Sequence, residues 1–214
     1  MMTKLILVRH GQSQANIDSV FAGHTNTPLS ELGVLQANKT AEFLKENYKI
    51  DIAYASDLQR AYNTGKTIAD KQGIQVIKSN NLREIYAGVW EGLSFIDIKE
   101  RFPDSYKTWK EDIGNALPNE GESVSELQFR IINEIKEIAC KNENKTILIA
   151  THATPIRSLL CYIKGLPLSE MHNVPWVSNS SITVMDYEND SFNIILEGYD
   201  KHLGNSSSTL SKIV

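Results

Sequence analysis

Short apolar runs alternate with longer amphipathic stretches along most of this chain. The runs at residues 3–8, 50–55, 74–77 and 146–150 are typical of buried strands, because they are short and almost continuously apolar. Stretches with apolar residues at helical spacing lie between or after them. Strands that alternate with helices form a largely parallel sheet with helices on both faces. The sequence therefore predicts an α/β fold, a three-layer α/β/α sandwich with a mostly parallel central sheet.

Capping residues and glycines indicate where the helices begin and end. Ser30 is a good N-cap for an amphipathic helix, in which Gly33 is the weak point. Ser56 and Asp57 predict the cap of another helix, which Gly73 ends. Further helices are predicted at 95–101, 105–112, 124–138 and 155–164, with Pro103 separating the first two.

The last third of the chain predicts an antiparallel addition to the sheet. Residues 181–187 and 192–197 alternate in polarity around a short polar turn, as expected for a hairpin. With 214 residues, 41% of them hydrophobic, the chain is long enough to bury one full core. We predict a single domain over residues 1–203, followed by a serine-rich and frayed tail over 204–214.

Net charge and cysteine usage exclude several classes of protein. The 22 basic and 26 acidic residues give a net charge of −4, without the basic excess of nucleic-acid or anionic-membrane binders. The 2 cysteines form no Cys-x-x-Cys motif or Cys/His cluster, which argues against disulfides and structural zinc. No run resembles a signal peptide or reaches the roughly 20 apolar residues of a membrane span. We expect a cytoplasmic protein without nucleic-acid or membrane partners.

Two histidines, His10 and His152, directly follow predicted strands. Ligands of parallel sheets bind beyond the carboxyl ends of the strands, where both histidines would lie. A lone histidine there is most often structural, and His10 could also be a nucleophile or a metal ligand. Arg9 and Gly11 favour an anion site, because a guanidinium binds phosphate oxygens and glycine lets an anion approach the backbone. Asn16 could add a neutral donor.

Three further residues each have an ordinary explanation when taken alone. Arg60 could be a surface arginine on its helix, Glu84 a solvated loop carboxylate and His152 a core histidine. Together with Arg9 and His10, however, they form a complete set for phosphoryl transfer. The arginines would bind a dianionic phosphate, one histidine would attack phosphorus, and the carboxylic acid would protonate the leaving oxygen. A metal is not expected, because arginines beside the histidines oppose a divalent cation.

Several segments of the chain resemble the histidine phosphatase superfamily, in its phosphoglycerate mutase-like branch, branch 1. They are LVRHGQSQAN (7–16), AGHTNTPLSELGVLQA (22–37), ASDLQRAYNTG (55–65), LREIYAGVWEG (82–92), GES (121–123) and ATHATPIR (150–157). They follow the family's order and cover nearly the whole chain to about residue 199. The resemblance implies the phosphoglycerate mutase-like fold and phosphoryl transfer through a phosphohistidine.

The resemblance also implies roles for the matching residues. His10 would be the nucleophile, and Glu84 would be first the proton donor and then the base for water. Arg9, Arg60 and His152 would complete the catalytic phosphate pocket, and residues 23–25 would border the substrate entrance. The substrate-binding residues that it implies are Arg9, Asn16, Gly23, His24, Thr25, Arg60 and Ala153.

The chain departs from the family pattern at two places. Gln12 and Ser13 stand where the family often has Glu-Thr, and Ser13 keeps a hydroxyl. Ala153, Thr154 and Pro155 follow the second histidine, where the family often has glycine. We expect catalysis to survive the first change. At the second, the backbone N–H of Ala153 remains available, but Pro155 has none.

The residues after the acid favour a phosphatase over a mutase. Phosphoglycerate mutases resemble this loop but continue with Arg-His-Tyr-Gly, whereas Ile85 and Ala87 here replace the charge and the phenol. We expect a phosphatase of small phosphorylated metabolites that needs no metal and no cofactor. The alternatives are a cofactor-dependent phosphoglycerate mutase and, less favoured, a non-catalytic phospho-ligand binding module or a protein phosphatase. A homodimer is left open.

An insertion at residues 102–118 is expected to cover the pocket. It contains Tyr106, Trp109, Asn115 and Leu117, a mixture of aromatic and polar side chains. Trp90 either lines the same pocket or packs in the core. These residues suit a small phosphomonoester but do not choose among sugar phosphates, phosphoglycerates and nucleotide fragments.

Overall fold

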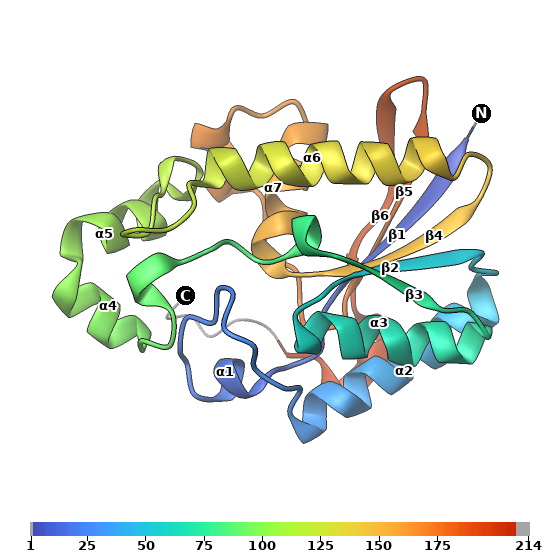
Figure 1. Cartoon of the computed structure of the whole chain (residues 1–214), viewed down its shortest axis with the longest axis horizontal. Helices are drawn as coiled ribbons and strands as arrows, with labels where there is room; N and C mark the ends of the chain where they lie inside the picture. The colour runs from blue at the N-terminus through green and yellow to red at the C-terminus, as the bar shows by residue number, and fades with distance from the viewer. Residues whose placement is uncertain (1, 209–214) are drawn as a thin grey trace.

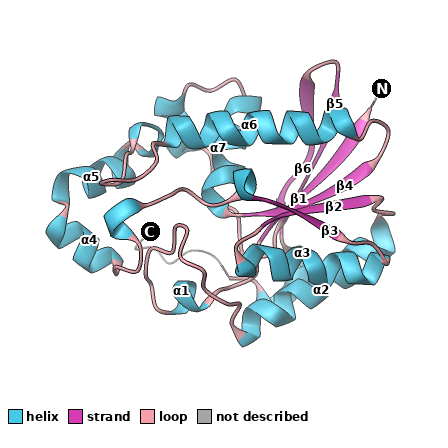
Figure 2. Cartoon of the chain, in the orientation of Figure 1, coloured by secondary structure: helices cyan, strands magenta, loops and turns pink. Residues whose placement is uncertain are grey.

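The computed structural model describes residues 2–208 and contains a six-stranded mixed sheet between two layers of helices (Figure 1, Figure 2). The strand order is β3-β2-β4-β1-β5-β6. The strands are β1 (Thr3–Arg9), β2 (Ile52–Ser56), β3 (Val76–Ser79), β4 (Thr146–Thr151), β5 (Ile182–Glu188) and β6 (Ser191–Tyr199). The first four are parallel to one another, and β5 and β6 add two antiparallel pairings, β1 with β5 and β5 with β6. The predicted sandwich and its hairpin are confirmed.

The α-helices of the described residues are α1 (Gln14–Ile17), α2 (Glu31–Asn47), α3 (Gln59–Gln72), α4 (Phe95–Arg101), α5 (Pro103–Glu111), α6 (Val124–Lys141) and α7 (Ala153–Ile163). Figure 1 shows α6 and α7 on one side of the sheet and α2 and α3 on the other. Helices α4 and α5 project beyond the sheet, on the side where α1 lies. Helix α5 lies within the insertion at residues 102–118 that was expected to form a cover, and α4 directly precedes it.

Alternation along β1 supplies the core of both layers. Leu5 and Leu7 belong to the larger apolar cluster, which includes the inward face of α6. Ile6 and Val8 belong to the smaller cluster, which includes residues of α2 and α3. All four side chains are fully buried, so β1 is a central strand that is covered on both faces. Its carboxyl end is therefore held rigidly.

The pairing register places the two site histidines next to each other. Arg9 of β1 pairs with Thr151 of β4, and both strands end there. His10 directly follows β1, and His152 directly follows β4. The N–H of His10 donates to the carbonyl oxygen of Thr151 over 3.0 Å. Parallel strands that end in register therefore bring together residues more than a hundred positions apart in the sequence.

Helix termini confirm some predicted caps and correct others. Ser30 caps α2, where its side chain accepts from the N–H of Gly33. The cap predicted from Ser56 and Asp57 is wrong: α3 begins after Leu58, without a side-chain cap. The Asp57 carboxylate accepts hydrogen bonds from Arg83 instead.

Two further differences concern a proline and a tail. Pro103 begins α5 rather than separating it from α4, because a proline is tolerated in the first helical turn, where its N–H is not needed. Residues 204–208 are not frayed. Gln36 of α2 donates to the carbonyl oxygen of Ser206 and to the hydroxyl of Ser208. The rest of the predicted tail, 209–214, lies outside the described residues.

Over residues 2–208, no helix combines the length and the apolar character that a bilayer crossing needs.

Candidate active site

His10 lies at the carboxyl end of β1, and its ring is held in one orientation. Its Nδ1 is 2.7 Å from the carbonyl oxygen of Gly11. A carbonyl oxygen can only accept, so Nδ1 carries the proton and Nε2 of the neutral ring has a free lone pair. Burial lowers the pKa of His10 well below its usual value, and the charges of Arg60 and Arg9 lower it further. His10 is therefore neutral at neutral pH, as a nucleophile must be.

Two buried arginines flank this histidine in the phosphate-binding part of the site. Arg9 donates from Nη1 to the carbonyl oxygen of Val177 over 2.6 Å, and its buried Nε has no partner among residues 2–208. Arg60, on the first turn of α3, donates to the carbonyl oxygens of Thr25 (2.8 Å) and Gly23 (2.7 Å). Burial lowers the pKa of each guanidinium to about 10. Both remain charged at neutral pH and can bind a phosphate.

Two of the residues predicted to border the substrate entrance contact Arg60. Gly23 and Thr25 accept hydrogen bonds through their backbone oxygens and so orient Arg60. Gly23 has a φ of 48°, a conformation that favours glycine. Its neighbour His24 donates from Nε2 to the carbonyl oxygen of Glu84 over 2.8 Å. This segment therefore connects Arg60 with the loop that carries the acid.

His152 is the N-cap residue of α7 and lies against His10. The two ring centroids are 5.1 Å apart, and the ring planes are inclined by 64°. Nε2 of His152 is 2.9 Å from the Ser56 hydroxyl, and its buried Nδ1 has no partner within residues 2–208. Burial lowers the pKa of His152, and Arg60 and His10 add to that effect. His152 is thus neutral and lies against the His10 ring, with Nδ1 unpaired among residues 2–208.

Glu84 lies in the loop after β3 and is half-buried. Its Oε1 accepts from the N–H of Ile85 over 2.9 Å, and its Oε2 accepts weakly from the N–H of Thr154 over 3.4 Å. Arg130 of α6 donates to the carbonyl oxygen of Glu84 over 2.9 Å, and also to Arg83. The backbone of the acid is thus fixed, and backbone N–H groups hold both of its carboxylate oxygens.

The loop after His10 is packed closely against α2. A Cβ on Gly33 would lie 2.0 Å from the carbonyl oxygen of Gln12, and one on Gly11 would lie 2.4 Å from the carbonyl oxygen of Gly33. Both positions therefore require glycine. Gly33, predicted to be the weak point of its helix, is what allows the helix to approach the site loop.

Asn16, on the short helix α1, completes this loop. Its Oδ1 accepts from the N–H of Ser13 over 3.0 Å and from the amide of Asn179 over 3.3 Å. With the oxygen engaged twice, the Nδ2 hydrogens remain as donors for a ligand. Asn179 also donates to the carbonyl oxygen of His10 over 3.1 Å, so one side chain holds both site residues. No motif in the sequence pointed to Asn179.

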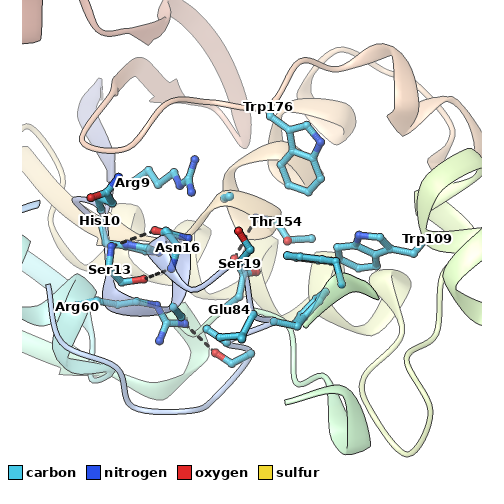
Figure 3. Close-up of a pocket in the computed structure, with 18 residues that line it drawn as sticks. Arg9, His10, Ser13, Asn16, Ser19, Arg60, Glu84, Trp109, Thr154 and Trp176 are labelled. Carbon is cyan, nitrogen blue, oxygen red and sulfur yellow. Dashed lines mark hydrogen bonds between the residues drawn. The ribbon is translucent and has the colours of Figure 1, made fainter. Parts of the chain in front are cut away.

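These residues surround a cavity of about 170 Å³ (Figure 3). Of the predicted site residues, seven line it: Arg9, His10, Asn16, Gly23, Arg60, Glu84 and Ala153. Among residues 2–208, His24, Thr25 and His152 contact the lining residues from behind rather than line the cavity themselves. The structure thus gathers all ten in one place, in two layers.

Aromatic residues line the other part of the cavity. Trp109 of the insertion lines it as predicted, together with Phe21, Phe95 and Trp176, which the sequence analysis did not single out. Trp90 is fully buried and donates to Asn119, so it packs in the core behind the cavity. Phe21 and Trp176 lie in irregular segments, where periodicity gives no signal of a lining position.

Comparisons with known proteins identify the family of the chain. Residues 5–199 match the sequence profile of the Histidine phosphatase superfamily (branch 1). The chain is 31% identical over 204 residues, 95% of each protein, to Phosphoserine phosphatase 1 of Hydrogenobacter thermophilus. Two solved structures are similar: Bacillus stearothermophilus YhfR (TM-score 0.90, 27% identity, 94% of this chain and 99% of that one) and the mycobacterial glucosyl-3-phosphoglycerate phosphatase Rv2419c (TM-score 0.84, 26%, 94% and 100%).

The chain belongs to branch 1 of the histidine phosphatase superfamily. The predicted family, fold class and enzyme class, a histidine phosphatase, are confirmed.

Proposed function

We propose that this protein hydrolyses small phosphomonoesters through a phosphohistidine on His10, without a metal ion. One observation carries the proposal: the hydrogen bond from Nδ1 of His10 to Gly11 leaves Nε2 as a nucleophile in a cavity that two arginines make positive. Phosphatases among its relatives, named for phosphoserine and glucosyl-3-phosphoglycerate, support a phosphomonoester as substrate.

The first step transfers the phosphoryl group to the enzyme. Nε2 of His10 attacks phosphorus, the ester P–O bond breaks, and Glu84 gives its proton to the departing alcohol oxygen. Arg9 and Arg60 bind the equatorial oxygens, whose negative charge they neutralise. Glu84 lines the same cavity as His10, which supports its proposed role as the acid.

The second step regenerates the enzyme. The Glu84 carboxylate takes a proton from a water molecule, the water oxygen attacks phosphorus, and the P–N bond to His10 breaks. Inorganic phosphate leaves, and Glu84 is again protonated for the next turnover. The charge that a metal would otherwise supply comes from the two guanidinium groups.

Water rather than a second hydroxyl is proposed as the acceptor. Ile85 and Ala87, which stand where mutases have a charged residue and a phenol, are both fully buried in the apolar core. They therefore offer no polar contact to a phosphoglycerate.

The pair of free cysteines, Cys140 and Cys161, fits the proposed cytoplasmic location.

The test is phosphate release from a panel of phosphomonoesters in the presence of EDTA, with His10→Ala beside the wild type. We expect release that the variant loses and EDTA does not affect. No release from any ester, with isomerisation of phosphoglycerate that requires 2,3-bisphosphoglycerate, would instead establish the mutase. Release that EDTA abolishes and a divalent cation restores would contradict the metal-free mechanism.

A further inference from the structure

The cavity has two chemically different parts. Its phosphate-binding part contains Arg9, His10 and Arg60, and its other part is formed by Phe21, Phe95, Trp109 and Trp176, here called the aromatic wall. Figure 3 shows Trp109 and Trp176 across the cavity from Arg9 and His10, with Ser19 and Thr154 between. Once a phosphoryl group is bound at His10, its leaving group must lie against the aromatic wall.

Three residues of the aromatic wall form a preassembled cluster. The Phe21 ring lies 5.7 Å from Phe95 and 5.1 Å from Trp109, the latter nearly edge to face. Trp90 packs behind Phe21 and Trp109, at 5.7 Å and 6.1 Å. The three wall residues are between 3% and 7% exposed, so they are fixed before any ligand binds. A ligand ring packs on them without the cost of ordering side chains.

The fourth wall residue, Trp176, is fixed by an arginine of its own. The Arg157 guanidinium lies 4.3 Å from the centroid of the Trp176 ring, a cation–π contact. Arg157 also donates to the carbonyl oxygens of Val174 (2.6 Å) and His172 (3.2 Å). Val177 directly follows Trp176 in the sequence, and its carbonyl oxygen accepts a hydrogen bond from Arg9. The segment that carries Trp176 is therefore tied directly to the phosphate-binding arginine.

The charges of the cavity do not suit a charged leaving group. Within residues 2–208, Arg9 and Arg60 are the lysines or arginines that line it, and both belong to the phosphate-binding part. Ser19 and Thr154, which lie between the two parts of the cavity, each carry a hydroxyl group. A carboxylate on the leaving group would lose water against apolar rings without gaining an opposite charge, which is unfavourable.

We infer that the preferred substrates are phosphate monoesters of uncharged alcohols that carry one flat apolar group, rather than phosphorylated amino acids or glycerates. The inference rests on the proposed phosphatase activity and narrows its substrate class. A cavity of about 170 Å³ has room for a single ring. One hydroxyl or ether oxygen next to the ring could bond to Ser19 or Thr154.

Benzyl phosphate and phosphoserine are a suitable pair of probes, because both release a primary alcohol and differ mainly in the group that would meet the aromatic wall. We expect kcat/KM for benzyl phosphate to exceed that for phosphoserine and 3-phosphoglycerate by about 10- to 100-fold, the value of burying one apolar ring. Equal or higher kcat/KM for either charged ester would overturn the inference.

A variant of Trp176 distinguishes the loss of contacts with the leaving group from a loss of folding, because this side chain is only half-buried. Trp176→Leu is expected to lower kcat/KM for benzyl phosphate about tenfold more than kcat/KM for ethyl phosphate, mainly through KM. Trp176→Phe, which keeps a ring, is expected to retain most of the benzyl phosphate activity. An equal loss for both esters in Trp176→Leu would contradict a role in recognising the leaving group.

The same assays separate failure of this inference from failure of the proposed function. If no ester releases phosphate in a manner that depends on His10, the proposed function fails and the substrate class falls with it. If all esters are hydrolysed and phosphoserine is the best of them, only the substrate class is wrong.

Discussion

Nδ1 of His10 donates to the carbonyl oxygen of Gly11, the residue that follows it, over 2.7 Å. The contact fixes both the ring orientation and the tautomer, so Nε2 is the atom available for chemistry. Gly11 itself is held by a hydrogen bond from its N–H to the Thr64 hydroxyl and by its close approach to Gly33. The nucleophile is thus oriented by backbone that has little freedom to move.

Removal of the nucleophile is expected to abolish turnover. His10→Ala should lower kcat by about 10³-fold or more, because the covalent route through Nε2 is lost. Steady-state phosphate release measures the effect. Circular dichroism of the variant serves as the folding control, and a folded variant with the wild-type rate would refute the assignment of His10.

Replacement of the acid is expected to affect substrates according to their leaving groups. Glu84→Gln should slow hydrolysis of alkyl phosphates by about 10²- to 10⁴-fold, since their alcohols leave only when protonated. The transfer of the phosphoryl group from p-nitrophenyl phosphate should suffer less. Glu143→Gln, which removes an exposed carboxylate before β4, is the matched control. Equal losses of the transfer step for both kinds of ester would argue against proton donation by Glu84.

The free energy of unfolding is expected to decrease as the pH falls, because two histidines of the site are buried. Burial and neighbouring charges lower the pKa of His10 and His152 below the ordinary 6.5. Below pH 6.5 the unfolded chain therefore binds more protons than the folded one, and the free energy of unfolding decreases as the pH falls. Above pH 6.5 this contribution is fully present.

Urea unfolding between pH 7.5 and pH 5 measures this dependence. The double variant His10→Asn/His152→Asn should show a weaker one. A remainder is expected, because the pKa values of His24 and His202 are lowered as well. An unchanged slope in the double variant would show that the two site histidines are not the groups responsible.

The close approach of α2 to the site loop makes Gly33 sensitive to any side chain. Gly33→Ala places a Cβ 2.0 Å from the carbonyl oxygen of Gln12, a backbone atom that cannot move aside cheaply. We expect a loss of about 1–3 kcal/mol in the free energy of unfolding and reduced activity. Val34→Ala, on an exposed position of the same helix, should change stability by less than about 0.5 kcal/mol. Similar values for the two variants would contradict the close contact.

Asn179 is expected to matter although it lies far from the motifs. Asn179→Ala removes one donor to the His10 carbonyl oxygen and one to Asn16 Oδ1, which leaves these acceptors with the N–H groups of Ser180 and Ser13, respectively. We expect a loss of about 1–3 kcal/mol in stability and a lower kcat, with the exposed Asn173→Ala as control. Unchanged kcat in a variant that is less stable would assign Asn179 a purely structural role.

The sequence was sufficient for the features that depend on local signals. The strand that ends at Arg9 and the strand that ends at Thr151 were evident from their apolar runs, and the histidines beyond them followed. The ordered segment up to Ser208 was not predictable, because its contacts with Gln36 connect residues 170 and more positions apart. A serine-rich composition says nothing about such partners.

The site also contains features that only the folded chain reveals. Gly33 is unfavourable in its helix when the sequence is considered alone. The reason for a glycine there is its close contact with the carbonyl oxygen of Gln12, which forms only in the folded chain. Trp90 lies in a family motif yet is a core residue, whereas Trp176 lies in no motif and lines the cavity. Gly23 and Thr25 act through backbone oxygens, for which side-chain identity gives no signal.

The central claim is that His10 accepts the phosphoryl group. Glu84→Gln allows a direct test with p-nitrophenyl phosphate, because the good leaving group departs without an acid while the second step lacks its base. We predict a rapid burst of about one p-nitrophenolate per chain. Rapid quenching at alkaline pH and mass spectrometry should then place the phosphoryl group on His10. A phosphoryl group on another residue, or turnover with neither a burst nor a phosphoenzyme, would contradict the account.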